Sequence, residues 1–330
     1  MSMSTEMPED LRTSASEPVH ETSAGTRDWT LALAGGEGVR LADYVQRRFG
    51  CRIPKQYCRL VGNRSTLEHT LERLNKLTPP LRTLTVIGTG HAEHALPQLA
   101  GKSDHVFRQP GPRDTGVAMY VALAMIKRWQ PGAVVTITPT DHYVMPSARY
   151  VAQVRTARAV AGQLRDSVVV LGARVRSSDA DPELGSLALG DELSQVPPLR
   201  RVTAFVERPG RARAQQMVDA GALASTMVAC GTVDALWKLG RAAEPQLIDI
   251  LDSFVPLVGT RDETEAIEWI YNAVLPVSLA HDVFERGAEH LVALELEGIA
   301  WSDWGRAEQI ESALAERRSR ALVPGRAYAP

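Results

Sequence analysis

The sequence predicts an α/β fold, with one principal domain built on a sheet of parallel strands. Short runs of β-branched and aliphatic residues alternate with amphipathic segments, as expected of parallel strands joined by crossover helices. The chain has 330 residues and is 44% hydrophobic. That length and apolar content are enough to bury one large core, or one core with a smaller appended unit.

The elements of the first half follow in order along the chain. Residues 1–28 are rich in Ser, Thr, Glu and Pro and have no apolar period, which predicts a disordered tail. Apolar runs at 30–34, 84–88, 105–109, 134–138 and 168–172 predict strands that are buried on both faces. A capping box of Ser65 and Glu68, followed by leucines at helical spacing, predicts a helix start.

The second half begins near Val202. Apolar runs at 202–208 and 291–296 predict two more strands, and helical spacing predicts helices near 232–239, 244–254 and 263–273. From Arg317 the sequence is basic and polar, which indicates a solvated helix end.

Charge and hydropathy exclude two kinds of partner. The formal net charge is -2, so no excess of Lys and Arg exists to neutralise a run of phosphates, and nucleic acid is not expected as a partner. No stretch approaches the roughly 20 apolar residues that cross a bilayer, and the N-terminus lacks the basic-then-apolar order of a secretory signal. We therefore expect no membrane association and a cytoplasmic location.

The cysteines and two nearby histidines do not form a predicted metal site. Cys51, Cys58 and Cys230 fit no zinc-ligand spacing, which suits a reducing compartment, and all three are expected to be packing residues. His91 and His94 lie three residues apart but have no evident third ligand, so they are expected at the surface.

The first predicted strand runs into a glycine-rich turn, LAGGEGVRL at 33–41. Gly35, Gly36 and Gly38 let the backbone bring several N–H groups close to an anion. Leu41 stands where a dinucleotide fingerprint needs its third glycine, and no Gly-Lys-Ser/Thr follows, so neither familiar nucleotide loop is present. A glycine loop that ends in Arg40 suits a triphosphate; a plain strand-to-helix turn is the alternative.

Two charged residues stand in suggestive places. Lys55 follows Pro54, so a stiffened backbone could aim its ammonium at a phosphate; a solvated surface lysine is the alternative. Asp141 follows directly on the apolar run 134–138, so we expect it at the carboxyl edge of the sheet, where open α/β sheets bind ligands. A turn or cap after a strand would also explain this aspartate. His142 beside it either orients the carboxylate or is a structural histidine.

The order of motifs resembles that of the mannose-1-phosphate guanylyltransferases and, more broadly, the sugar-phosphate nucleotidyltransferases. The resemblance covers about 29–310 and rests on six separated segments. These are GGEGVRL at 35–41, PKQY at 54–57, QPGPRDTG at 109–116, PTDH at 139–142, FVERP at 205–209 and WSDWG at 301–305. An ordered set of this kind is far more specific than any single motif.

The resemblance implies a three-layer Rossmann-like nucleotidyltransferase fold with a mostly parallel mixed sheet. It implies a nucleotide-binding half at about 29–200, a sugar-phosphate-binding half at about 201–310 and a polar C-terminal tail. It also implies catalysis by Arg40 and Lys55, and Mg²⁺ held by Asp141 and Asp303. Magnesium commonly uses one or two carboxylates together with substrate phosphates. A helix cap for the segment after Arg306 is the alternative for Asp303.

The implied substrates are a nucleoside triphosphate, with GTP favoured, and a sugar 1-phosphate. The implied nucleotide-binding residues are Gly35, Gly36, Gly38, Gln109 and Thr115. The implied residues that bind the sugar phosphate are Glu183, Glu207 and Arg208. The oligomeric state stays open, with a homodimer as one option.

The sequence departs from the family pattern mainly at the sugar site. Arg208 replaces a lysine, and the segments 182–187, 224–227 and 278–281 lack the family's aromatic, asparagine and aspartate residues. These changes indicate either an altered sugar substrate or a regulatory homologue that binds nucleotide with little turnover. A glycosyltransferase with a similar sheet is a third possibility, but it gives no reason for Lys55 and Arg40 together.

Overall fold

The computed structural model describes residues 27–193 and 198–321. The tail predicted at 1–28 therefore lies outside the described residues except for its last two positions, and Asp28 already opens the first strand. The C-terminal helix α10 (Ala307–Ala321) covers the region from Arg317 to Ala321 as predicted, and the rest of that tail lies outside the described residues.

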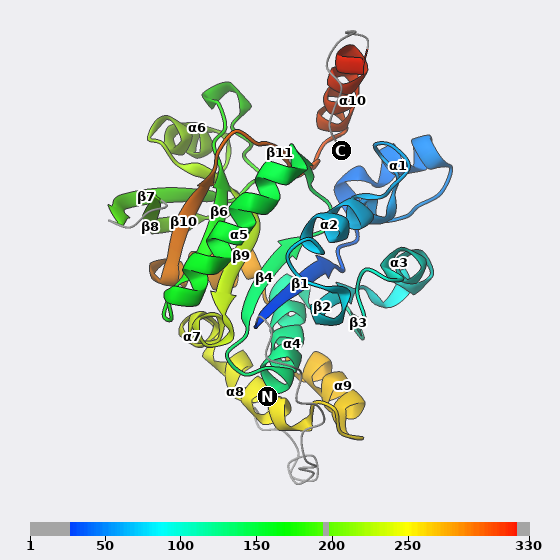
Figure 1. Cartoon of the computed structure of the whole chain (residues 1–330), viewed down its shortest axis with the longest axis vertical. Coiled ribbons are helices and arrows are strands. Elements are labelled where there is room, and N and C mark those ends of the chain that lie inside the picture. The colour runs from blue at the N-terminus through cyan, green and yellow to red at the C-terminus, as the bar shows by residue number, and fades with distance from the viewer. Residues whose placement is uncertain (1–26, 194–197, 322–330) are drawn as a thin grey trace.

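One nine-stranded sheet organises the fold, in the order β3-β2-β1-β4-β9-β6-β10-β8-β7 (Figure 1). Its strands are β1 (Asp28–Ala34), β2 (Thr83–Ile87), β3 (His105–Arg108), β4 (Val134–Pro139), β6 (Val168–Ala173), β7 (Ser186–Leu193), β8 (Leu199–Val206), β9 (Leu223–Thr232) and β10 (Leu291–Leu296). The first four are mutually parallel, as are β6 and β10. Among these nine strands only β8 and β9 run against the rest, so the sheet is mostly parallel and mixed.

Helices cover both faces of the sheet, which gives three layers (Figure 1). One face packs against α4 (Asp114–Trp129), α7 (Val233–Ala243), α8 (Pro245–Phe254) and α9 (Glu263–Ala273). The other packs against α2 (Thr66–Leu74), α3 (Ala92–Leu99) and α5 (Ser147–Gln163). The predicted α/β class and three-layer nucleotidyltransferase fold are confirmed.

Two short helices lie outside these layers. Helix α1 (Ala42–Phe49) packs beside α10, and α6 (Arg211–Asp219) lies near the edge strand β7. The remaining pair of strands, β5 (Tyr143–Met145) and β11 (Ala300–Ser302), forms a separate antiparallel ribbon. This ribbon is important for the site because it joins two segments that are far apart in the sequence.

Most elements lie where the sequence predicts them. All seven predicted strands are present, and Ser65 and Glu68 make both bonds of the capping box at the start of α2. Strands β5, β7, β9 and β11 were not predicted. Strand β9 has the sequence LASTMVACGT, which is mostly small residues without alternation, and it is a strand because it is buried between β4 and β6.

Two predictions about single side chains are wrong. Cys58 and Cys230 are buried, but Cys51 is exposed because it lies in the turn after α1. His91 is only 4% exposed and packs edge-on against Tyr57, so it is a core residue, while His94 is half-buried.

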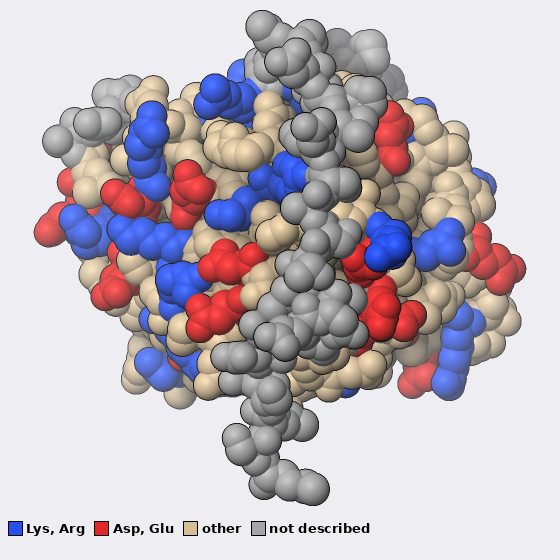
Figure 2. Space-filling model, turned by 90° about the horizontal axis from the view of Figure 1, so that it is seen from below, with Lys and Arg blue, Asp and Glu red and all other residues tan. Residues whose placement is uncertain are grey.

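The surface charge agrees with the small net charge. Figure 2 shows Lys and Arg interspersed with Asp and Glu on the face that it presents. Among the described helices, none combines the length and the apolar content that a membrane span requires.

Candidate functional site

The glycine turn leaves the carboxyl end of β1 and is shaped by close approach of other segments. Gly38 has φ of +63°, a conformation that favours glycine. A Cβ on Gly35 would lie 2.1 Å from Nε2 of Gln109, whereas a Cβ on Gly36 would meet nothing within 4 Å. Gly36 and the exposed Arg40 therefore border open space, and Gln109 reaches the turn from the end of β3.

Hydrogen bonds from two buried side chains, Gln56 and Tyr57, hold this turn in place. Nε2 of Gln56 donates to the carbonyls of Ala34 and Gly36, at 2.9 and 2.7 Å, and the Tyr57 hydroxyl donates to the carbonyl of Ala34 at 2.8 Å. Gln56 is 3% exposed and Tyr57 is 4% exposed. No role was predicted for these two side chains, although they belong to the PKQY segment, one of the six motifs.

Lys55 connects the two aspartate segments. Its Nζ lies 3.0 Å from Oδ2 of Asp141, and it donates to the main-chain carbonyl of Asp303 and, at 3.2 Å, to that of Trp304. The side chain is only 6% exposed. The ammonium has three N–H donors, so the protein alone supplies an acceptor for each, and the surface-lysine alternative is excluded.

The Asp303 carboxylate is held from two sides. Its Oδ2 pairs with Arg40 at 3.1 Å, and its Oδ1 accepts from the Gly305 amide at 3.1 Å. Gly305 has no room for a Cβ, which would lie 2.6 Å from this carboxylate. Trp304 between them has φ of +47°, which is rare for a bulky residue. Such strain persists only where the surroundings fix the backbone, and it clusters at functional sites.

Asp141 stands at the end of a short chain of polar contacts. The Trp301 indole lies 3.2 Å from Nδ1 of His142 and can only donate, which assigns the imidazole proton to Nε2, 3.5 Å from Oδ1 of Asp141. The pairing of β5 with β11 places Trp301 opposite Val144 and so creates this contact.

Electrostatics keep Asp141 ionised. Burial alone would raise its pKa, but the charge of Lys55, with help from His142 and the hydrogen bond from Lys55, outweighs burial and lowers the pKa of this carboxyl. Burial lowers the pKa of His142, so the imidazole is neutral near neutral pH.

The segment 109–116 comprises the turn after β3 and the first three residues of α4. Gln109 is 8% exposed, and its carbonyl accepts from the Thr89 hydroxyl. Thr115 is exposed; its hydroxyl lies 3.0 Å from Oδ1 of Asp114 and accepts from the Leu279 amide at 3.4 Å. Asp114 has φ of +61°, a second strained position within a predicted motif.

The predicted sugar-phosphate residues also come together. Nε of Arg208 lies 3.6 Å from Glu207 and 3.9 Å from Glu183. Burial and the nearby Glu285 raise the pKa of Glu207, against the opposing charge of Arg208. The side chains of Arg208 and Glu183 are 66% and 55% exposed, so these contacts are loose.

The segment 224–227 offers little to a ligand. Ala224, Ser225 and Thr226 are buried in β9, and the Thr226 hydroxyl donates to the carbonyl of Leu171 at 2.6 Å. Met227 is half-buried with φ of +55°.

The two aspartates are residues of the type that could hold a hard divalent cation. The Asp141 carboxylate pairs with Lys55 and the Asp303 carboxylate pairs with Arg40, and carboxylate oxygens are the ligands that Mg²⁺ prefers. In the described part of the chain, no three His, Cys, Asp or Glu side chains gather as a metal cluster. A cation here would take its remaining ligands from water and substrate phosphates.

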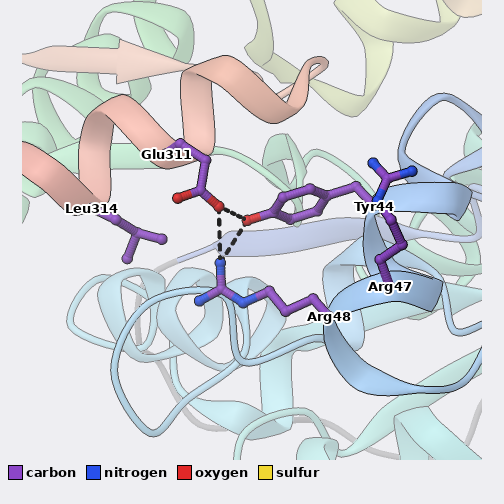
Figure 3. Close-up of a pocket in the computed structure, with 5 residues that line it drawn as sticks. All are labelled: Tyr44, Arg47, Arg48, Glu311 and Leu314. Atoms are coloured by element: carbon purple, nitrogen blue, oxygen red, sulfur yellow. Dashed lines mark hydrogen bonds and ion pairs between the residues drawn. The ribbon is translucent and has the colours of Figure 1, made fainter.

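A hollow away from the motif residues lies between α1 and α10. Its volume is about 340 Å³, and it is lined by Tyr44, Arg47, Arg48, Glu311 and Leu314. Figure 3 shows Tyr44 and Arg48 directed toward Glu311, and the Tyr44 hydroxyl donates to that carboxylate. None of the motif residues lines it, and its interactions serve to attach α10 to α1.

A glycine-rich turn and a buried lysine at the carboxyl edge of a mostly parallel sheet are typical of nucleotide-binding α/β proteins. Comparison with known proteins shows to which family within this class the chain belongs. A family model described as "Nucleotidyl transferase" matches residues 30–319. The chain belongs to that family, which confirms the resemblance seen in its motifs.

Individual relatives are distant. The chain is 27% identical over 197 residues to the xanthan biosynthesis protein XanB of Xanthomonas campestris, covering 58% of this chain and 39% of that protein. It is 27% identical over 202 residues to a mannose-1-phosphate guanylyltransferase of Salmonella montevideo, covering 58% and 40%. The chain thus matches about two fifths of the length of these relatives.

Solved structures match over more of the chain. A protein of Thermus thermophilus described as a mannose-1-phosphate geranyltransferase has a TM-score of 0.73 at 26% identity, covering 87% of this chain and 80% of that one. A mannose-6-phosphate isomerase of Helicobacter pylori has a TM-score of 0.63 at 17% identity, covering 83% and 98%. The second likeness shows the fold alone.

Proposed function

We propose that the protein is a sugar-1-phosphate nucleotidyltransferase, which converts a nucleoside triphosphate and a sugar 1-phosphate to a nucleotide-sugar and pyrophosphate. The observation that carries the proposal is the position of Lys55, which ties Asp141 to the main chain of Asp303 beside the glycine turn. This arrangement places two cations, Lys55 and Arg40, beside the glycine turn, where two polyanionic substrates would have to meet.

In the proposed reaction, an oxygen of the sugar 1-phosphate forms a bond to the α-phosphorus while the bond to the pyrophosphate oxygen breaks. No covalent intermediate with the protein is needed. Because both reactants are anions, alignment and charge neutralisation supply most of the acceleration.

Each residue has a specific part in this reaction. The turn at Gly35, Gly36 and Gly38 holds the triphosphate through backbone N–H groups, and half-exposed Arg40 binds the leaving phosphates. Lys55 exchanges one of its protein acceptors for an oxygen of the α-phosphate, where negative charge builds.

We assign metal binding to Asp141 and Asp303. A bound Mg²⁺ would neutralise phosphate charge during the transfer. The lowered pKa of Asp141 keeps its carboxylate available to such a cation at neutral pH.

Substrate recognition completes the proposal. Gln109 and Thr115 face the base, for which we favour guanine because relatives are named as guanylyltransferases. Glu183, Glu207 and Arg208 face the sugar and its phosphate, and mannose 1-phosphate is the first candidate for the same reason. We place the reaction in the cytoplasm and leave a homodimer as an option.

The direct test is pyrophosphate release. Purified protein is incubated with GTP, Mg²⁺ and a panel of sugar 1-phosphates, and pyrophosphate is measured; ATP, CTP and UTP are run in parallel. Release with one pair of substrates supports the proposal. No pyrophosphate release with any pair of substrates, together with tight nucleotide binding by calorimetry, would instead support a second candidate function.

That second candidate is a nucleotide-binding regulatory homologue. It is favoured by the segment 224–227, whose first three side chains are buried in β9 instead of facing a sugar. Ordinary turnover with any sugar 1-phosphate would exclude it.

A further inference from the structure

A small polar cavity borders the candidate site, and His142 and Trp304 are among the residues that line it. Its volume is about 60 Å³. Its polar lining includes Arg64, His69, Arg73, His142, Ser147 and Trp304. No Asp or Glu is among the described residues that line it. The cavity therefore has cationic and N–H donor groups and no anionic group.

Arg73 is a buried cation that has no anionic partner here. It is 8% exposed, and its Nη2 donates to the Thr70 hydroxyl at 2.9 Å. Its guanidinium lies 5.7 Å from the centre of the Tyr150 ring. Within residues 27–193 and 198–321 no carboxylate lies at ion-pair distance from it, because the adjacent Glu72 pairs with Arg64 at 2.8 Å. Its Nε is buried without an acceptor.

Trp304 brings a second unsatisfied donor to the same cavity. It is 1% exposed and stacks on Tyr143 at 5.0 Å between ring centres. Its Nε1 is buried and has no acceptor in the described part of the chain. A buried donor that lacks an acceptor loses its hydration without replacement, and two of the residues that line this cavity each carry such a donor.

We infer that this cavity binds a small inorganic anion, such as a halide or a single tetrahedral oxyanion. The volume of about 60 Å³ is well below the roughly 300–1,000 Å³ of pockets that hold small organic ligands, so the cavity suits an ion better than a nucleotide or a sugar phosphate. Water alone could accept from the two donors but would leave the charge of Arg73 uncompensated in a buried site. Arg64 also lines the cavity; its side chain is 52% exposed and its charge is paired with Glu72, so Arg73 is the buried cation that is left for an anion.

The test measures thermal stability against anion concentration. Chloride, bromide, sulfate or phosphate is titrated at constant ionic strength, with a large organic anion making up the difference. The wild-type protein is expected to show a saturable rise in Tm with at least one of these ions. The halide and oxyanion arms identify which shape fits.

Variants connect that response to the cavity. Arg73→Met removes the charge with similar volume and is expected to abolish the saturable rise, whereas Arg73→Lys is expected to keep it. The matched control is Arg158→Met. This buried arginine on α5 is already satisfied by Thr136 at 2.9 Å and by Asp28 at 3.6 Å, so the anion response should remain.

A second variant and a crystallographic measurement cover the case in which Arg73→Met does not fold. Trp304→Phe removes the N–H donor, together with part of the buried ring, and is expected to raise the half-saturating anion concentration about ten-fold. Bromide-soaked crystals are expected to show an anomalous peak between Arg73 and Trp304. An equal response in wild type and Arg73→Met, or only water in the cavity, would overturn the inference. Neither readout depends on turnover, so failure here is separate from failure of the proposed reaction.

Discussion

Two parts of the candidate site are built in opposite ways. The cation cluster, which we define as Arg40, Lys55, Asp141 and Asp303, is interlocked: Lys55 and Asp303 have side chains only 6% and 7% exposed, Lys55 donates to the main chain of Asp303, and the Asp303 carboxylate pairs with Arg40. The acceptor edge, which we define as Glu183, Glu207 and Arg208, has longer contacts and more exposed side chains.

The difference shows where the fold specifies geometry before substrate arrives. The cation cluster draws on four separate segments, and each charge in it has a partner of opposite charge or a main-chain acceptor. Preorganised charge of this kind costs little reorganisation during reaction. At the acceptor edge the substrate itself must order the side chains. Mutations in the cluster should therefore affect turnover strongly, whereas those at the edge should affect substrate affinity mildly.

The largest effect is expected from Lys55→Met. The variant loses the ammonium that joins both aspartate segments, and turnover should fall about 10²–10³-fold, as for loss of one preorganised donor to a charged transition state. Initial rates of pyrophosphate release measure this. Lys238→Met is the matched control, because Lys238 is half-exposed and its ion pair is with the exposed Asp166. Equal rates in both variants would show that the cluster is not the reactive centre.

Asp141→Asn should destabilise the protein in a pH-dependent way. The pKa of Asp141 is lowered in the folded state, so its charge stabilises the fold above the usual carboxyl range and stops doing so as pH falls through the folded-state pKa. Removing one partner of a largely buried pair should cost about 3 kcal/mol at neutral pH.

Urea denaturation of wild type and Asp141→Asn at several pH values measures this difference. It should vanish in acid. Asp166→Asn, at an exposed ion pair, should show almost no difference at any pH. A constant difference across the range would mean that Asp141 is held by packing and not by its charge.

Trp301→Phe should weaken Mg²⁺ dependence without unfolding the protein. The indole N–H fixes the tautomer of His142, which in turn faces Asp141. Loss of such an outer hydrogen bond should raise the half-saturating Mg²⁺ concentration about ten-fold. Activity is measured against Mg²⁺ concentration, with Trp129→Phe, at the opposite end of the sheet, as control. Identical Mg²⁺ curves would leave the chain of three residues with a structural role only.

Two glycines of the turn, Gly35 and Gly36, test whether the space beside Gln109 is needed for nucleotide binding. Gly35→Ala displaces Gln109, whose Nε2 lies 2.1 Å from the new Cβ, while Gly36→Ala meets nothing. KM for GTP should rise about five-fold in the first, the equivalent of one hydrogen bond, and stay near wild type in the second. The opposite ranking would place the triphosphate against Gly36 and not beside Gln109.

The smallest effect is expected from Arg208→Met. Its ion pairs are long and exposed, so the free energy of unfolding should change by less than about 0.5 kcal/mol. KM for the sugar 1-phosphate should rise only about three-fold, consistent with a solvent-screened contact. A fall in turnover as large as that expected for Lys55→Met would contradict the proposed difference between the cation cluster and the acceptor edge.

Much of this site could be predicted from sequence because its signals are local. Apolar runs predicted the strands that precede the glycine turn and Asp141, and a strand-end aspartate must lie at the carboxyl edge whatever the rest of the chain does. The capping box of Ser65 and Glu68 is likewise a local signal, because four consecutive residues are enough to predict the helix start. The chain order of the motifs then predicted the family.

Only the tertiary structure decided how distant segments meet. The ribbon of β5 and β11 has three residues on each side, too short for a periodic signal, yet it places Trp301 beside His142 and so brings the two aspartate segments together. Strand β9 is a strand because neighbours pair with it on both sides. The burial of Lys55 follows from the same assembly, since two of its three acceptors are main-chain carbonyls that any sequence would carry. Local patterns determine which elements form, while long-range pairing determines which charges face each other.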